Sequence, residues 1–223
     1  AGIAVVADPP LKHRNSPRQD WLVTRIIADL GSAAERMQLI SPYFVPGQDG
    51  NQALIAMRRQ GIAIELVTNS LAATDVAAVH SGWKRYRQPL LEAGVEVFEL
   101  KRRGHRAGIA VPFGSSAASL HTKAYLVDGR RGFVGSFNLD PRSATVNTEM
   151  GVGFDDPALG QRLQQEFAWL AAADRSYRLG LDRQGRLQWR DGDGHLHAHE
   201  PDTRWWLRGW VWLLGLLPIE SQL

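Results

Sequence analysis

Residues 120–149 constrain the fold of this chain more than any other stretch, because they combine a hairpin pattern with chemically active side chains. Two short patterns occur there, namely H-x-K-x4-D at His121, Lys123 and Asp128 and G-S-x-N at Gly135, Ser136 and Asn138. Each residue alone has an ordinary interpretation, such as a turn former or a solvated strand charge. Their joint occurrence at fixed spacing suits covalent attack on a phosphodiester.

The residue types also predict how this stretch folds. Residues 120–127 are β-branched, aromatic and apolar, and residues 128–129 begin a turn. Residues 132–138 are expected to return as a second strand. Asn147 and Glu149 are expected to share one face of a third strand, because side chains alternate along a strand.

A turn over residues 128–131 sets the expected register of the hairpin. It places Lys123 opposite Ser136 and His121 opposite Asn138. Side chains that lie directly opposite each other on one face are about 5 Å apart at Cβ. The hairpin would therefore bring an imidazole, an ammonium and two small hydrogen-bonding groups together.

These residues resemble the HKD motif of the phospholipase D superfamily. The continuation NLDPRSATVNTEMG, and the segments SPYFVP and TNSLAATDVAAVHSGW, resemble the bacterial cardiolipin synthase and phospholipase D-like branch, and the similarity covers nearly the whole chain. The resemblance implies an α/β fold, built as an α/β/α sandwich with a mixed central sheet. Most members of that branch carry two HKD motifs, whereas this sequence has one.

The motif predicts a covalent mechanism. Attack by His121 on phosphorus would give a phosphohistidine and divide one displacement into two steps. Lys123 would supply fixed positive charge, and Ser136 and Asn138 would add hydrogen bonds where charge develops.

Two acidic residues are expected to support the motif. Glu149, with Asn147 nearby, would hold the second imidazole nitrogen of His121, and Asp128 would act from the turn. No acidic cluster in the sequence indicates a catalytic metal. We therefore expect a metal-independent reaction without a cofactor.

The reaction needs two imidazoles, one as nucleophile and one as general acid for the leaving alcohol. The resemblance implies that two HKD elements meet across a pseudo-twofold interface. The second element comes either from a missing N-terminal half or from the partner in a homodimer. We favour the missing half, because branch members resemble this chain only as their second half, and His121 is then either nucleophile or acid.

Further candidate residues stand at the ends of expected strands. Strands are expected at residues 3–7, 37–40, 62–68 and 95–100. Helices are expected at residues 19–34, 51–60 and 157–173, and a further long helix is expected to end at about residue 93. Ligands gather at such strand ends in α/β sheets, so Tyr43 and Phe44 are candidates for a pocket wall. Ser70, Asp75 and His80 are candidates for the same site. The alternatives are buried aromatic rings in a Pro-bounded loop and a helix cap at residues 74–75.

Composition favours a partner that carries phosphate. The 223 residues include 26 basic and 23 acidic side chains, with a pI near 9.5. The absence of cysteine excludes disulfides and thiolate chemistry. We expect a catalytic domain over residues 1–174 and a C-terminal unit over residues 175–223. The chain opens on an apolar run without Met, so we expect a fragment or a processed half of a longer protein.

The C-terminal unit is expected to form a small β-meander and a terminal amphipathic helix. His195, His197 and His199 alternate along one strand, where we favour a solvent-facing edge over a metal site. The helix expected over 204–217, capped by residue 202 or 203, carries four of the eight Trp and is too short to span a bilayer. We expect it to contact an anionic membrane surface; the alternative is docking on the domain's own core.

The leading hypothesis is phosphatidyl transfer between phospholipids, as in cardiolipin synthesis, or phospholipid hydrolysis, at the periphery of a bacterial cytoplasmic membrane. One alternative is a homodimeric HKD nuclease. The Trp-rich end argues against it, so nucleic acid is not an expected partner. The other alternative is a catalytically silent module that binds lipid or a partner protein.

Overall fold

The computed structural model describes residues 2–10, 12, 16–102 and 120–217. Its described part is built on one ten-stranded mixed sheet in the order β1-β7-β6-β5-β2-β3-β4-β8-β9-β10. The strands are β1 (Gly2–Ala7), β2 (Arg36–Ile40), β3 (Ala63–Asn69), β4 (Glu96–Leu100), β5 (Lys123–Val127), β6 (Arg131–Gly135), β7 (Met150–Asp155), β8 (Ser176–Leu181), β9 (Leu187–Arg190) and β10 (Leu196–His197).

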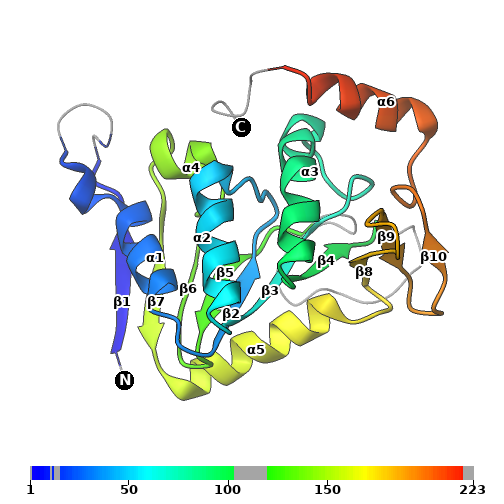
Figure 1. Cartoon of the computed structure of the whole chain (residues 1–223). Coiled ribbons are helices and arrows are strands. Elements are labelled where there is room, and N and C mark those ends of the chain that lie inside the picture. The colour runs from blue at the N-terminus through cyan, green and yellow to red at the C-terminus, as the bar shows by residue number, and fades with distance from the viewer. Residues whose placement is uncertain (1, 11, 13–15, 103–119, 218–223) are drawn as a thin grey trace, which may run out of the picture.

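Helices cover both faces of the sheet. They are η1 (Arg18–Asp20), α1 (Leu22–Gly31), α2 (Gly47–Arg59), α3 (Ala77–Glu92), α4 (Pro141–Thr145), α5 (Pro157–Ala171) and α6 (Trp205–Leu214). Figure 1 shows α1, α2 and α3 on one face and α5 on the other. The predicted α/β fold with a mixed sheet between helical layers is confirmed.

The central strands are buried on both faces, which explains their continuous apolar sequence. On β2, Leu39 joins the core under α1, α2 and α3, whereas its neighbour Ile40 joins the core under α5. β2, β3 and β4 run parallel, and β5 runs antiparallel to β2. The motif-bearing strand β5 is therefore fixed in the middle of the sheet.

The predicted register of the hairpin is wrong by one residue. β5 pairs with β6 so that Lys123 lies opposite Gly135 and Val127 opposite Arg131. The loop holds three residues instead of four, because Asp128 itself takes a left-handed conformation, with φ 50°. Arg131 belongs to the strand, where its guanidinium donates to the Ser32 hydroxyl at 2.6 Å.

Helix starts and the third strand also differ from expectation. α2 begins at Gly47, four residues before the expected start at residue 51. α1 begins at Leu22, whose N–H donates to the Asp8 carboxylate at 2.8 Å. β7 begins only at Met150, because α4 and the turn after it occupy the preceding residues.

The C-terminal strands form the predicted antiparallel meander. β8 pairs with β4 and thereby extends the main sheet, and β9 and β10 follow. The border expected between residues 174 and 175 stays a prediction. α6 packs against α3 (Figure 1), is N-capped by Arg204 without a side-chain bond, and ends at Leu214 instead of residue 217. No helix within the described ranges combines the length and apolar character needed to cross a membrane.

Candidate active site

Lys123 and His121 lie at the start of β5, beside the carboxyl ends of β2 and β3. The Lys123 side chain is buried, and its Nζ donates to the carbonyl oxygen of His121 at 2.9 Å. Burial lowers the pKa of this ammonium, and the carboxylates of Glu149, Asp140 and Asp75 oppose that shift without cancelling it. His121 itself is exposed, so its imidazole is accessible next to a partly desolvated positive charge.

Asn69 fixes the backbone that presents His121. Its Oδ1 accepts the N–H of Leu120 at 2.9 Å, and its Nδ2 donates to the Leu120 carbonyl at 3.4 Å. The Asn69 side-chain amide therefore forms the same two hydrogen bonds with the Leu120 backbone that a residue on a neighbouring strand would form. Sequence reasoning missed Asn69; the only signal was a polar residue at the end of the apolar run 62–68.

Glu149 is a buried carboxylate that collects side-chain donors from the catalytic segment. It accepts hydrogen bonds from the Ser136 hydroxyl, from Ser143 Oγ at 3.0 Å and from Asn147 Nδ2 at 3.1 Å. Among the described residues, no hydrogen bond joins the His121 imidazole to Glu149. Ser136 thus contacts Glu149 within this chain, and the expected pairing of Glu149 with His121 stays a prediction.

An N-terminal ion pair positions the segment that carries Glu149. Asp8 Oδ2 accepts from Lys12 Nζ at 2.8 Å and from the N–H of Glu149 at 2.9 Å. Lys12 Nζ also donates to the carbonyls of Ser143 at 2.9 Å and Asn147 at 3.0 Å. Both charged side chains are fully buried, so they are structural. The sequence analysis missed them, although an Asp and a Lys four residues apart follow the first strand.

Asn138 is buried next to this network. Its backbone N–H donates to Ser143 Oγ at 3.2 Å, and Ser143 is itself held by the carboxylate of Asp140, which caps α4. Among the described residues, Asn138 Oδ1 and Ser70 Oγ are buried atoms without a hydrogen-bond partner. Buried polar groups are normally satisfied, so Asn138 Oδ1 is left to accept a hydrogen bond from a ligand donor or from water.

Asp128 lies at the opposite end of β5 from Lys123 and holds the start of β2. Its carboxylate accepts the backbone N–H groups of Ala34 at 3.0 Å, Glu35 at 2.9 Å and Arg36 at 3.0 Å. Burial alone would raise the pKa of Asp128, but these N–H groups outweigh it and lower the pKa. Its contacts are those of a supporting residue.

The aromatic candidates differ in their surroundings. The Tyr43 hydroxyl donates to Asp75 Oδ1 at 2.6 Å, and burial together with this carboxylate raises the pKa of Tyr43. Phe44 is buried in the core, with its ring 5.2 Å from that of Trp83 in an edge-on arrangement. The predicted cap at residues 74–75 takes another form: Thr74 Oγ1 accepts the N–H of Val76, one residue before α3.

His80 is engaged in a buried ion cluster. Its Nε2 lies 2.9 Å from Glu200 Oε2 and 2.6 Å from Arg87 Nη2. Arg87 also contacts Glu99 at 2.7 Å, and Glu200 has its pKa lowered by Arg87 and His80 against the effect of burial. The ring therefore links α3 to the chain before α6, and the structure gives it no contact with Lys123.

Within the described residues, no group of three or more His, Asp or Glu side chains is arranged to hold a metal ion. The rings of His195 and His197 lie 4.5 Å apart, and His197 Nε2 is 3.7 Å from Asp191. The hairpin instead offers an exposed imidazole beside a buried ammonium and an amide with free bonding capacity. The ammonium can bind an anion, and the imidazole can attack it.

Residues 26–171 match the family model described as cardiolipin synthase, PLD-like domain. The chain is 41% identical over 222 residues to cardiolipin synthase C of Escherichia coli K12, covering 96% of this chain and 46% of that protein. It is 29% identical over 160 residues to cardiolipin synthase B of the same organism, covering 72% and 35%. The chain therefore spans about half, or less, of the length of these relatives.

Solved structures give the same fold. The phospholipase D family member Nuc from Salmonella typhimurium has a TM-score of 0.55 at 17% identity, covering 76% of this chain and 95% of that one. Phosphatidylserine synthase of Haemophilus influenzae has a TM-score of 0.58 at 16% identity, covering 79% and 40%. The resemblance seen in the motif is thus confirmed, and the chain belongs to the family of cardiolipin synthase, phospholipase D-like domains.

Proposed function

We propose that this chain carries one HKD element of an enzyme that cleaves and transfers the phosphodiester of a phospholipid through a phosphohistidine. The observation that carries the proposal is that His121 is exposed, while the buried Lys123 ammonium donates a hydrogen bond to the backbone carbonyl of the same residue. The similarity to cardiolipin synthases supports phospholipid as the substrate, with phosphatidyl transfer and hydrolysis as the two outcomes.

The reaction proceeds in two displacements. One imidazole attacks phosphorus, the P–N bond forms, and the P–O bond to the leaving alcohol breaks while a second imidazole donates a proton to that alcohol. An acceptor alcohol or water then attacks phosphorus, gives its proton to the second imidazole and releases the first. Lys123 and Asn138 stabilise the charge on the phosphoryl oxygens. Glu149 holds Ser136 and is proposed to bind an imidazole when both motifs are assembled.

The second imidazole is proposed to come from another HKD element. This chain aligns with about half of cardiolipin synthase C, which favours a second half in a longer protein over a homodimer. His121 then serves either as nucleophile or as general acid.

The membrane is proposed as the place of action. α6 points Trp205, Trp206, Trp210 and Trp212 outward, whereas Val211 packs inside. Indole rings favour the headgroup zone, and Arg204 and Arg208 lie on the same segment to meet anionic lipid. This arrangement fits a protein at the periphery of a bacterial cytoplasmic membrane.

The test is turnover of phosphatidylglycerol vesicles by the wild-type chain and by His121→Ala, each assayed alone and together with a second HKD element, with and without EDTA. The matched control is His199→Ala, because His199 is also exposed but lies far along the chain from the motif. We expect loss of turnover in His121→Ala alone and no effect of EDTA. Equal turnover in wild type and His121→Ala contradicts the catalytic role.

Four other outcomes have defined meanings. Inhibition by EDTA contradicts metal independence. Cleavage of DNA without turnover of lipid favours the nuclease. Turnover only when the second HKD element is present favours a longer chain over a homodimer, and absence of turnover under both conditions favours a silent module.

A further inference from the structure

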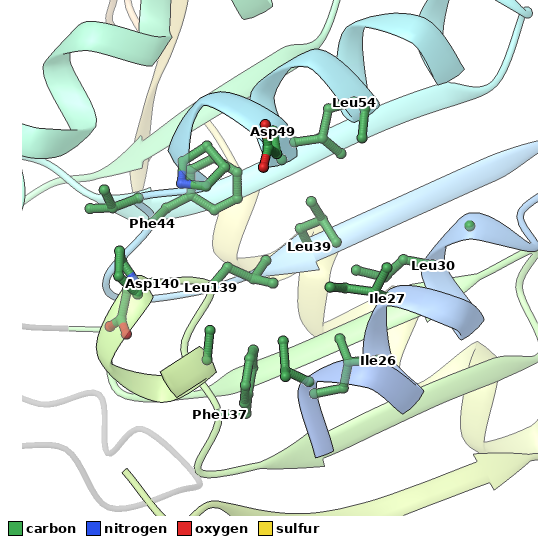
Figure 2. Close-up of a pocket in the computed structure, with 18 of the residues that line it drawn as sticks. Ile26, Ile27, Leu30, Leu39, Phe44, Asp49, Leu54, Phe137, Leu139 and Asp140 are labelled. Carbon is green, nitrogen blue, oxygen red and sulfur yellow. The ribbon is translucent and has the colours of Figure 1, made fainter. Parts of the chain in front are cut away.

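An apolar cavity of about 510 Å³ lies in the helical layer beside the catalytic hairpin. Its walls come from α1 and α2, its floor from β2, and one end from the chain leading into α4, as Figure 2 shows. The lining side chains are apolar except for two carboxylates, Asp49 and Asp140. The volume lies within the range of about 300–1,000 Å³ that is typical of small-molecule sites.

One end of the cavity is built from the motif itself. Phe137 and Leu139 line it, and both flank Asn138, the buried amide with an unpaired oxygen. Asp140 borders the same end, and its carboxylate is close enough to Lys123 to act on the pKa of that ammonium. The cavity is therefore apolar apart from Asp49 and Asp140, and it adjoins the motif residues without being lined by Lys123 or Asn138, so it suits the hydrocarbon part of a lipid and not its phosphate.

The lining suits a hydrocarbon chain better than a peptide. A peptide segment would bring backbone N–H and C=O groups that need partners, and the apolar walls supply almost none. A hydrocarbon needs no hydrogen bonds. The floor is also pre-formed, because Leu39, Leu54 and Ile26 are buried core residues.

We propose that this cavity holds a fatty acyl chain of the phospholipid whose phosphodiester reaches the HKD site, an inference that rests on the proposed function. The acyl chain enters between Ile27 on α1 and Ala53 on α2 (the opposed walls) and ends beside the motif. The cavity then determines which lipids place their phosphodiester next to His121.

The test is binding of a fluorescent long-chain fatty acid, and of its short-chain homologue, to the purified chain. Ala53→Phe places a ring in the cavity, whereas the control Ala56→Phe puts the same ring on an exposed part of α2 that does not line it. We expect long-chain binding to weaken about tenfold or more in Ala53→Phe, because the ring displaces several methylene groups. Ala56→Phe should bind as wild type does.

A second variant tests the same site in case Ala53→Phe does not fold. Ile27 is 64% exposed, so Ile27→Gln should fold normally and still weaken binding of the long chain. Unchanged binding in Ala53→Phe and Ile27→Gln overturns the proposal, as does equal affinity for the long and short homologues. Loss of self-association in Ala53→Phe without fatty acid binding overturns it in favour of a second copy.

His121→Ala separates this inference from the proposed function. Acyl binding should be unchanged in that variant, while lipid turnover is lost. If turnover persists in His121→Ala and acyl binding still falls in Ala53→Phe, the catalytic role of His121 fails and the acyl site stands.

Discussion

At the scale of single residues, Lys123 is buried, and burial is unfavourable for its charged ammonium. Its folded-state pKa is lowered by burial, so the folded chain binds fewer protons than the unfolded chain between the two pKa values. The penalty for the buried charge is present at neutral pH and is relieved as the pH rises through that interval. The residue is retained there at a cost to stability, which fits a functional charge.

We therefore expect Lys123→Met to raise the melting temperature at neutral pH and to lower activity by about 100-fold, the usual effect of removing one charge-stabilising donor. The gain in stability should shrink as the pH approaches about 10, where an unfolded lysine loses its proton. Thermal unfolding across pH measures this, with the more exposed Lys84→Met as control. A lower melting temperature of Lys123→Met at pH 7 would refute the argument.

Lys12 is also a buried charge, but its partners are all structural, so its removal should lower stability instead of raising it. Lys12→Met leaves the buried Asp8 carboxylate without a counter-ion, with only the N–H groups of Leu22 and Glu149 as donors among the described residues, and breaking such a pair costs about 3–5 kcal/mol. The control is Arg186→Met, which breaks another i,i+4 pair, in which Arg186 itself is 73% exposed, and should cost about 0–1 kcal/mol. Urea unfolding of both variants gives the comparison. Similar losses in the two proteins would show that the Lys12 network is not the stabilising feature inferred here.

Residues of the motif could be predicted from sequence, and those that hold the motif could not. His121, Lys123 and Asn138 stand at fixed spacing within one hairpin, so the chain itself brings them close. Asp8 reaches Glu149 across 141 residues, and a contact of that separation leaves no local pattern. Asn69 was missed for the same reason.

At the scale of elements, the turn after β5 joins two strands through one carboxylate. Asp128 binds three N–H groups at the start of β2, and its pKa lies below the ordinary value. A depressed carboxyl pKa contributes stability that is present above the unfolded value and is lost as the pH falls through the folded value.

Asp128→Asn should therefore be less stable than wild type at neutral pH, by about 1–2 kcal/mol for charge-assisted bonds at a partly exposed site. The difference should begin to shrink as the pH falls below about 4, where the unfolded carboxyl becomes protonated, and should vanish only below the lowered pKa of the folded protein. Chemical unfolding at several pH values measures it. The control Asp174→Asn, at a highly exposed carboxylate, should show no such dependence, and a pH-independent difference for Asp128→Asn would contradict the assignment.

Element boundaries show where sequence patterns were sufficient. The apolar periodicity identified the longer helices and most strands, because burial on one or both faces imposes it, whereas the short helix α4 was not predicted. The hairpin register failed by one residue because it depended on the conformation of Asp128, and that conformation is stabilised by N–H groups nearly a hundred residues earlier in the chain. Local turn chemistry could not supply this contact.

At the scale of the whole molecule, α6 lies at one edge of the structure (Figure 1), and its Trp side chains are exposed. Trp205 is 78% and Trp212 is 63% exposed, so neither contributes much to the core. The double variant Trp205→Gln/Trp212→Gln should retain wild-type stability and bind anionic vesicles at least about tenfold more weakly, since indole rings anchor proteins at the headgroup zone.

Vesicle sedimentation measures this binding. Ile3→Gln/Val5→Gln is the control, because these two side chains are similarly exposed and apolar but lie on the edge strand β1. Equal vesicle binding by the Trp variant and the wild type would contradict the membrane role and would favour docking of α6 on the domain's own core.

The network around Asp8 also has a consequence for the order in which the protein is made. Asp8 and Lys12 leave the ribosome before their partners Ser143, Asn147 and Glu149, which follow some 130 to 140 residues later. Contacts of such separation form late, after the loop between them has closed. Glu149 is therefore fixed only when nearly the whole sheet is in place, so an incompletely synthesised chain carries the HKD residues without the support that orders them.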